Sequence, residues 1–259
     1  MSPHFDDAVL SCWSVLTGPR EIEVVNVFTS APARGTGLHE GELLTGAHDA
    51  VARARERATE DAASLALVGA RIHNLDLLEY PHWMASRRRT RRRWRRVARR
   101  LAQRRSSPFS GDEDRLREAM QATLPHIDGQ AHVYAPAALG GHPDHELVRE
   151  IGCRLLREGA RVSFYADQPY CYVYGWPHWV TGEAPDPYLD LERDWRRYLD
   201  TASASLTDLR VDVVRLGGAH QHKLRALQLY RTQFAVLEGG ANHRVSNPAL
   251  TGWEVFWHA

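Results

Sequence analysis

Residues 21–29 read EIEVVNVFT, and residues 47–68 form an alanine-rich stretch that ends at Gly69. The first stretch has the pattern of a buried β-strand, and the second predicts a long helix closed by its glycine. The same alternation continues, with strands predicted at 71–78, 131–135, 162–165 and 212–216 and helices at 112–124, 143–156 and 220–237. It predicts an α/β fold with a mostly parallel sheet flanked by helices.

Length and composition indicate one domain spanning residues 1–259. Hydrophobic residues make up 43% of the chain and charged residues 25%, as in ordinary globular proteins. No stretch approaches the ~18 unbroken apolar residues of a membrane span, and the polar, acidic start is unlike a signal peptide. Cys12, Cys153 and Cys171 are too scattered for a disulfide framework or a CxxC metal site. We therefore expect a cytoplasmic protein.

The basic residues are unevenly distributed. Twelve arginines and no acidic residue lie between Arg87 and Arg105, which leaves 21 basic against 32 acidic residues elsewhere. We expect a basic, helical insertion at about 84–111. It can be a solvated loop, a patch for an anionic substrate or lipid head group, or a nucleic-acid site with salt-sensitive affinity. Trp94 is the one aromatic residue between Arg87 and Arg105, which argues against a stacking platform, so we expect no nucleic-acid partner.

Two short clusters combine histidine with aspartate. Residues 2–7 read SPHFDD and residues 140–145 read GGHPDH, each at a predicted strand-to-helix turn. A lone HxxD is common, and an aspartate before a helix is often only an N-cap, so the prediction depends on the pairing of the two clusters. Zinc accepts histidine nitrogen and carboxylate oxygen, and a catalytic zinc keeps one position open. His4, Asp7 and His145 would supply such a set.

The remaining residues of the clusters suit amide hydrolysis. Asp6 is placed to act as a general base, and His142, oriented by Asp144, can stabilise the charge that develops on the amide oxygen. Active-site loops of parallel α/β folds follow the carboxyl ends of strands. We therefore expect an apolar strand in front of Ser2, although the sequence contains no such run there.

The two clusters resemble the paired PHxDD and HPDH signatures of the LmbE-like or PIG-L family of N-acetylglucosaminyl deacetylases. Further segments from Ser2 to Trp257 are similar to the family's pattern. They are Arg57 and Glu60 of an RxxE helix, DQPY at 167–170, KLRALQLYRTQ at 223–233 and EVFW at 254–257. The two His/Asp motifs are specific, and the other segments are supportive.

The resemblance implies a Rossmann-like, three-layer α/β fold and a hydrolase with one zinc ion per chain. It implies His4, Asp7 and His145 as metal ligands and Asp6 as the base that later protonates the leaving amine. It also implies His142 as the oxyanion stabiliser and Asp144 as its partner. For sugar binding it suggests three residues: Arg57, Glu79 and Tyr170.

The chain departs from the family at two further points. Ala8 stands where many members have glutamate, and Leu139, Gly140 and Gly141 precede the second cluster where some members have a tyrosine. Flat aromatic side chains often line sugar sites, and we consider three tryptophans for this role: Trp83, Trp176 and Trp179. His220 and His222 are interpreted as polar residues at a helix start.

The expected activity is removal of the acetyl group from an N-acetylated amino sugar or its glycoconjugate, releasing acetate. Alternative substrates are another acylated, glycosylated metabolite, a sugar nucleotide or a thiol-cofactor precursor. Fe²⁺ and Co²⁺ fit the same ligand types as Zn²⁺. The expected partner is a small molecule. The sequence does not fix the oligomeric state, and a homo-oligomer is compatible with it.

Overall fold

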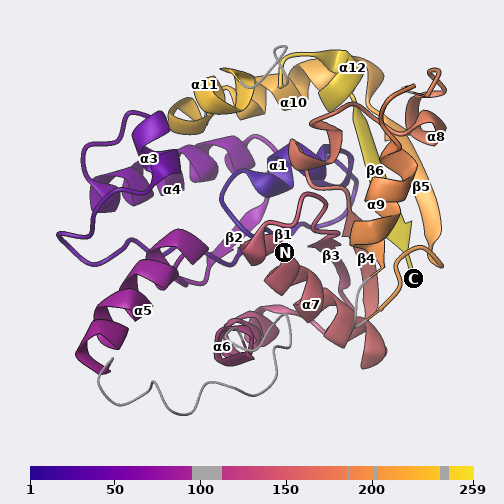
Figure 1. Cartoon of the computed structure of the whole chain (residues 1–259). Coiled ribbons are helices and arrows are strands. Elements are labelled where there is room, and N and C mark those ends of the chain that lie inside the picture. The colour runs from indigo at the N-terminus through magenta and orange to yellow at the C-terminus, as the bar shows by residue number, and fades with distance from the viewer. Residues whose placement is uncertain (95–112, 186, 201–203, 240–244) are drawn as a thin grey trace.

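The computed structural model describes residues 1–94, 113–185, 187–200, 204–239 and 245–259 (Figure 1). The predicted basic insertion begins within helix α5 (Tyr80–Trp94), where side chains are described as far as Arg87. Residues 95–111 of that insertion lie outside the described residues, so its predicted roles remain predictions. Within the described part of the chain, no helix is both long and apolar enough to cross a membrane.

The described strands form two sheets. β1 (Glu23–Asn26) pairs in parallel with β2 (Arg71–Asn74). The second sheet has the order β3-β4-β6-β5 and contains β3 (His132–Pro136), β4 (Arg161–Tyr165), β5 (Arg210–Arg215) and β6 (Trp253–His258). β3 and β4 are parallel, whereas β6 runs antiparallel to both of its neighbours. The predicted α/β class is confirmed, but the observed sheets are small and mixed, in place of one mostly parallel sheet.

Among the described strands, β6 is the one that the sequence analysis did not predict. Four of its six residues are buried, and it hydrogen-bonds to β4 on one side and β5 on the other. Trp257 lies opposite Phe164 and Val211 in these two pairings. Because both faces of β6 are covered, its sequence lacks the polar alternation of a half-exposed strand.

Helices surround the sheets on several sides. In chain order they are α1 (Asp7–Ser11), α2 (Trp13–Leu16), α3 (Glu40–Leu44), α4 (Ala50–Ala66), α5, α6 (Glu113–Thr123), α7 (Pro143–Arg157), α8 (His178–Thr181), α9 (Leu191–Leu199), α10 (His220–Leu227), α11 (Arg231–Gly239) and α12 (Pro248–Thr251). In Figure 1, α3, α4, α10 and α11 occupy the upper part of the view and α5, α6 and α7 the lower part.

The predicted helix at 220–237 is two helices, α10 and α11, separated by a short break. Tyr230 lies in this break, is buried, and donates its hydroxyl to Asp61 at 2.7 Å and to the Phe5 carbonyl at 3.1 Å. These bonds tie the turn to α4 and to the first cluster. A helix-period pattern continues across such a break, so periodicity alone does not reveal it.

Two of the three hydrophobic clusters among the described residues anchor the helices that begin at the His/Asp clusters. One contains Val148, Ile151 and Phe164 and joins α7 to β3 and β4. Gly152 permits this close packing, because a Cβ there would lie 2.8 Å from Ala135. The other cluster contains Val9 and Leu227 and joins α1, α4 and α10. The two His/Asp clusters of the sequence therefore begin helices that are anchored in separate parts of the core.

Candidate metal centre and active site

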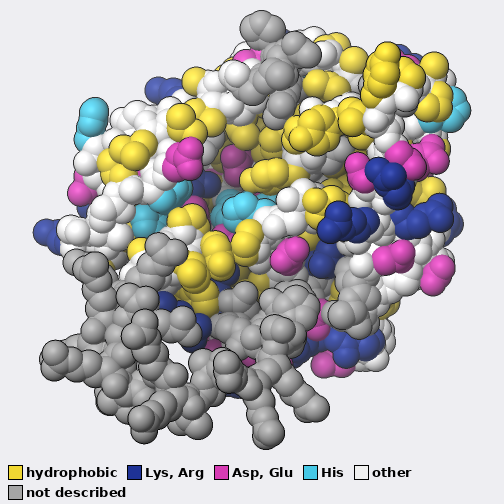
Figure 2. Space-filling model, viewed as in Figure 1, with side chains coloured by type: hydrophobic (Ala, Val, Ile, Leu, Met, Phe, Trp, Pro, Cys, Tyr) yellow, Lys and Arg dark blue, Asp and Glu magenta, His cyan; other side chains and the backbone are white. Residues whose placement is uncertain are grey.

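The candidate site forms where three strand-like segments end. His4 and Asp7 follow Ser2, which pairs in parallel with Asn26 of β1. His145 lies in the first turn of α7, after β3, and Asp167 lies just after β4. Figure 2 shows histidine side chains at the bottom of a depression in the centre of this face, with hydrophobic side chains around them. The predicted ligands thus come together although 138 positions separate Asp7 from His145 in the sequence.

The geometry of His4, Asp7 and His145 fits a divalent metal ion. The Asp7 Oδ2 atom lies 3.2 Å from His4 Nδ1 and 3.3 Å from His145 Nε2. Ligand atoms about 2.0–2.1 Å from a tetrahedral zinc lie roughly 3.3–3.4 Å apart. His145 Nε2 is also fully buried without a hydrogen-bond partner, which is costly for a polar atom unless a ligand meets it. The three ligand atoms lie within 4.8 Å of one another.

Each of the two histidines is held by a second carboxylate on its other nitrogen. His4 Nε2 lies 2.9 Å from Asp144 Oδ2, and His145 Nδ1 lies 2.6 Å from Asp167 Oδ1. Both carboxylates are fully buried. This arrangement fixes the ring and directs the opposite nitrogen toward a metal. The sequence analysis did not assign this role to Asp167, although its place after a predicted strand could have suggested it.

The two outer carboxylates are themselves fixed. Asp144 accepts hydrogen bonds from the Tyr80 amide at 3.0 Å and from the Arg115 guanidinium. Asp167 accepts from the Leu139 amide at 3.0 Å. Salt bridging and hydrogen bonding stabilise the buried charges, which would otherwise be expensive. The histidine rings are therefore set in place before any metal binds.

Protonation of the metal-free site follows from these charges. Burial opposes the charged form of His145, yet Asp7 and Asp167 raise its pKa to about 9. The pKa of His4 is also raised despite burial, because it contacts Asp144 and Asp7. Burial opposes the charged form of Asp7, but His145 and His4 hold its pKa well below the usual range. The site thus concentrates negative charge that either protons or a cation can neutralise.

Asp6, the predicted general base, is a buried carboxylate next to Asp7 in the sequence. Burial raises its pKa, and the neighbouring charge of Asp7 adds to the effect, while Arg57 and His4 oppose it. The residue is 7% exposed. A carboxylate with a raised pKa accepts a proton more readily than an ordinary surface aspartate.

His142 precedes helix α7 as its N-cap. Its Nδ1 atom accepts the Asp144 backbone N–H at 3.2 Å, so the proton of the neutral ring resides on Nε2. Burial and the positive charges of His4 and His145 lower the pKa of His142 to about 4. Asp144 therefore orients His142 through its backbone amide, whereas its carboxylate binds His4.

The three residues suggested for sugar binding lie around the same centre. Arg57 donates to Glu79 at 2.5 Å, and both side chains are mostly buried. Burial opposes the charge on Arg57, but Glu79 and Asp6 raise its pKa, so Arg57 stays charged. The Tyr170 ring lies 5.3 Å from that of His145 and 6.0 Å from that of His142. Tyr170 is 37% exposed, which leaves part of it accessible to a ligand.

Gly140 makes room for Tyr170. A Cβ at Gly140 would lie 2.8 Å from the Tyr170 Cβ, and the φ of this glycine is +96°. A side chain at position 140 would therefore displace the tyrosine. The glycine that departs from the family's pattern is thus coupled to an aromatic residue supplied by a different loop.

The other aromatic and histidine candidates have structural roles. Trp176 is buried and donates to the Leu250 carbonyl at 2.9 Å, and Trp179 packs on Trp195. The Trp83 ring stacks on the ring of Tyr80. The backbone amide of Tyr80 donates to Asp144, so Trp83 is linked to the site through Tyr80. His220 bonds to the Thr251 hydroxyl at 2.6 Å.

Among the described residues, two further groups could hold a metal: one shares His4 and adds His142 and Asp144, and the other consists of His39, Glu42 and His82. His39 caps helix α3 by accepting the Gly41 amide on Nδ1, and His82 Nε2 lies 3.0 Å from Glu42 Oε1. These contacts satisfy the groups without a metal. His39 Nε2 also lies 3.9 Å from Oε2 of Glu79, which is one of the residues suggested for sugar binding.

Comparison with known proteins relates the chain to deacetylases. No protein-family profile matches the sequence. The 2'-N-acetylparomamine deacetylase of Niallia circulans is 27% identical over 189 residues, an alignment that spans 66% of this chain and 66% of that protein. The chain is therefore similar to an amide hydrolase over about two thirds of its length.

Solved structures resemble the whole chain. A deacetylase from the biosynthesis pathway of teicoplanin superposes with a TM-score of 0.65 at 22% identity, covering 99% of this chain and 95% of that one. The A40926 pseudoaglycone deacetylase Dbv21 gives a TM-score of 0.63 at 20% identity, covering 99% and 94%. The chain shares the fold of these deacetylases.

Proposed function

We propose that the chain is a metal-dependent N-deacetylase that removes the acetyl group from an N-acetylated amino sugar or its glycoconjugate. The observation that carries the proposal is the buried set of His4, Asp7 and His145, with ligand atoms spaced for a metal and with Asp6 beside them. The relatives support the reaction, because the similar protein from Niallia circulans is named a deacetylase and the structural neighbours are deacetylases.

We assign the chain to the LmbE-like or PIG-L family and to its Rossmann-like fold as part of this proposal. Both motifs of the resemblance lie at strand ends around one centre, which is the arrangement expected of that fold. Zinc is the proposed metal, with one ion per chain. One structural neighbour is described as a zinc-inhibited form of teicoplanin deacetylase, which supports an affinity for zinc in this fold. When bound, the ion supplies a Lewis acid and makes water a nucleophile at neutral pH.

Asp6 carries the proton transfers of the proposed reaction. Its raised pKa suits removal of a proton from the attacking water and later delivery of that proton to the leaving amine. Burial limits competing contacts with bulk water. Loss of the acetyl group as acetate then leaves a free amine on the sugar.

His142 stabilises the tetrahedral oxyanion as a neutral hydrogen-bond donor. Its lowered pKa keeps the ring uncharged at neutral pH, and the Asp144 amide holds the proton on Nε2. A preorganised donor of this kind contributes most where water is excluded. Burial of a phenol favours its protonated form, and the pKa of Tyr170 is raised accordingly, so Tyr170 offers a second O–H near the same rings.

Arg57 and Glu79 bind sugar hydroxyls in this proposal. Their ion pair presents both donors and an acceptor at the edge of the site, next to Asp6. The names of the related proteins guide the choice of substrate. The similar protein is named for 2'-N-acetylparomamine, and the two structural neighbours are named for teicoplanin and A40926 pseudoaglycone. We infer that the substrate is an acetylated sugar carried on a larger metabolite.

The test combines metal analysis with acetate release. The purified chain is analysed for bound metal and assayed on a panel of simple N-acetylglucosaminides, acetylated aminoglycosides and acetylated glycopeptides. We expect about one zinc per chain, together with acetate release from a member of the panel. His145→Ala should lose both, whereas His222→Ala, at an exposed histidine of α10, should retain both. Absence of metal after reconstitution would refute the proposal, and metal without acetate from any member would refute the substrate class.

A further inference from the structure

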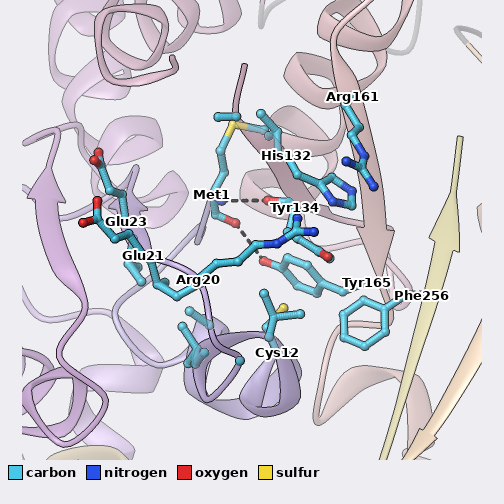
Figure 3. A pocket seen from close by; sticks show the side chains of 18 of the residues that line it. Met1, Cys12, Arg20, Glu21, Glu23, His132, Tyr134, Arg161, Tyr165 and Phe256 are labelled. Carbon is cyan, nitrogen blue, oxygen red and sulfur yellow. Dashed lines mark hydrogen bonds between the residues drawn. The ribbon is translucent and has the colours of Figure 1, made fainter. Parts of the chain in front are cut away.

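The surroundings of the Arg57–Glu79 ion pair decide what else a bound sugar can contact. The groove in Figure 3 has a volume of about 830 Å³, but none of the described residues that line it belongs to the candidate site. The Arg57 guanidinium carbon, in contrast, lies 5.8 Å from the centroid of the Phe5 ring. Phe5 stands between His4 and Asp6 in the sequence, so the ion pair borders the metal centre.

His39 reaches this ion pair from the start of helix α3, and its own contacts hold its ring in place. Its Nδ1 atom accepts the Gly41 amide at 3.1 Å, and its backbone amide donates to the Glu42 carboxylate at 2.9 Å. The His39 ring also packs on the ring of His82, with the centroids 4.9 Å apart and the planes at 67°. His82 is fixed in turn, since its Nε2 atom lies 3.0 Å from Glu42 Oε1. The His39 ring is therefore oriented before any ligand binds.

The hydrogen bond from Gly41 sets the tautomer of His39. Because Nδ1 accepts an N–H, the proton of the neutral ring resides on Nε2. Burial lowers the pKa of His39, although the charges of Glu42 and Glu79 act in the opposite direction, so the ring is neutral at pH 7. The His39 side chain is 25% exposed. Its Nε2–H group is thus an oriented, uncharged donor that a ligand can reach.

This donor faces an acceptor across a gap that a hydroxyl group fills. Glu79 Oε1 accepts from Arg57 at 2.5 Å, whereas Glu79 Oε2 lies 3.9 Å from His39 Nε2. Burial opposes the charge on Glu79, but Arg57 lowers its pKa, so Oε2 remains an acceptor. The two atoms are too far apart to bond directly, yet a hydroxyl oxygen about 2.8 Å from each would fit between them at an angle of roughly 90°. A hydroxyl both accepts and donates, whereas an ether only accepts and an ammonium only donates.

We propose that His39 and Glu79 together bind one free hydroxyl of the amino sugar and make the chain selective for substrates that carry it. His39 donates from Nε2 to the hydroxyl oxygen, and Glu79 Oε2 accepts the hydroxyl proton. The inference rests on the proposed function, because it names a specificity determinant of the same reaction. A sugar without this hydroxyl leaves both protein groups unpaired, which a site built on hydrogen bonds penalises strongly.

The substrate arm of the test compares sugars that differ at a single position. The zinc-loaded chain is assayed for acetate release from the simplest N-acetylated sugar that it hydrolyses and from the monodeoxy analogues of that sugar. We expect kcat/KM for one analogue to be lower by about 10²-fold or more than for the parent sugar. Equal kcat/KM for all analogues would show that water fills the gap and would overturn the proposal.

The protein arm separates the two nitrogens of His39. Asparagine places its side-chain oxygen near the position of Nδ1 and keeps the cap of α3, but it has no atom at Nε2. Glutamine carries an NH₂ group out to the position of Nε2 but gives up the cap. His39→Asn should keep Tm within about 1 °C and lose at least about tenfold in kcat/KM on the parent sugar, with the disfavoured analogue within about twofold. His39→Gln should lower Tm by about 2–4 °C and yet lose less in kcat/KM than His39→Asn.

The remaining outcomes distinguish this inference from the proposed function. Equal losses for His39→Asn and His39→Gln, or the reverse order, would show that His39 only caps α3, and so would an equal loss on the parent sugar and on every analogue. His222→Asn, at an exposed histidine of α10, is the control and should match the parent chain. If the zinc-loaded parent chain releases acetate from no substrate, the proposed function fails and this inference fails with it. Hydrolysis without dependence on His39 refutes this inference alone.

Discussion

Replacing Asp167 by asparagine tests whether the outer carboxylates build the metal site. Asp167 Oδ1 lies 2.6 Å from His145 Nδ1, and its Oδ2 accepts the Leu139 amide at 3.0 Å. Asparagine has the same shape but one acceptor oxygen and one NH₂ group. Whichever way the amide turns, its NH₂ group meets a donor on one side. Asp167→Asn therefore removes the charge behind His145 and breaks one of two buried hydrogen bonds.

The magnitude follows from these two losses. An unsatisfied buried donor costs about 1–3 kcal/mol, and removing a partner of a metal-bound histidine typically costs 10–100-fold in metal affinity, which is about 1.4–2.8 kcal/mol. We expect the zinc dissociation constant of Asp167→Asn to rise by roughly 10–100-fold. The ligands themselves remain, so activity at saturating zinc should recover to within about tenfold of the parent chain.

The assay is zinc competition against a chromophoric chelator, followed by acetate release across a range of zinc concentrations. Asp208→Asn serves as the matched control, because Asp208 is exposed and lies outside the site. An Asp167→Asn variant that binds zinc as tightly as the control would show that the Asp167–His145 contact does not shape the metal site. A folded Asp167→Asn variant that does not bind zinc at all would contradict the expectation that His4, Asp7 and His145 provide most of the zinc affinity.

Three further predictions concern the chemistry. Asp6→Asn should keep its zinc and lose about 10²–10⁴ in kcat, because it removes the general base; unchanged turnover in acetate release with metal bound would contradict the assignment. Glu79→Gln should raise KM by roughly tenfold and leave kcat within about threefold of the parent chain. The substitution removes the charge that Glu79 shares with Arg57 and weakens one charge-assisted contact at the proposed sugar-binding site. A fall in kcat alone would instead indicate that Glu79 acts in the chemical step. Zinc affinity should fall by at least about tenfold for each unit of pH below 9. The reason is that His145 of the metal-free site is protonated there and must release its proton before it binds zinc. A zinc dissociation constant that does not change between about pH 6 and 8 would exclude this competition.

The sequence predicted most elements because their patterns were local. β1, α4, β3, α7 and β4 all lie within one to three residues of the predicted bounds. The two specific motifs likewise led to residues that the structure brings together. Each motif starts a helix just after a strand, and parallel packing brings such starts to one edge.

The features that the sequence could not reveal depend on tertiary contacts. The β6 strand is recognised by its pairing with β4 and β5, and its fully covered faces carry no alternation. The contact of Asp167 with His145 joins segments that are 22 residues apart, and spacing does not encode it. The ion pair of Arg57 and Glu79 is a similar case, since neither residue's neighbours indicate its partner.

A buried polar network explains why several weaker motifs accompany the two His/Asp clusters. Lys223 and Glu254, both almost fully buried, lie 3.2 Å apart, and Lys223 also donates to Gln168 at 3.1 Å. Glu254 accepts the backbone amides of Trp13 and Ser14 at the start of α2.

Burying such a pair costs desolvation energy that packed apolar residues would not incur, so its value is better sought in positioning than in stability. The pair connects α10 and β6 with two segments that matter for the site. One is the loop that carries Asp167, next to Gln168, and the other is the turn that follows α1 and its Asp7. The segments that contain Lys223, Gln168 and Glu254 thus hold Asp7 in a fixed position relative to Asp167, the carboxylate behind His145. Lys223→Met should therefore lower zinc affinity even though no atom of Lys223 touches the ligands, and unchanged affinity in a folded variant would show that the network serves the core alone.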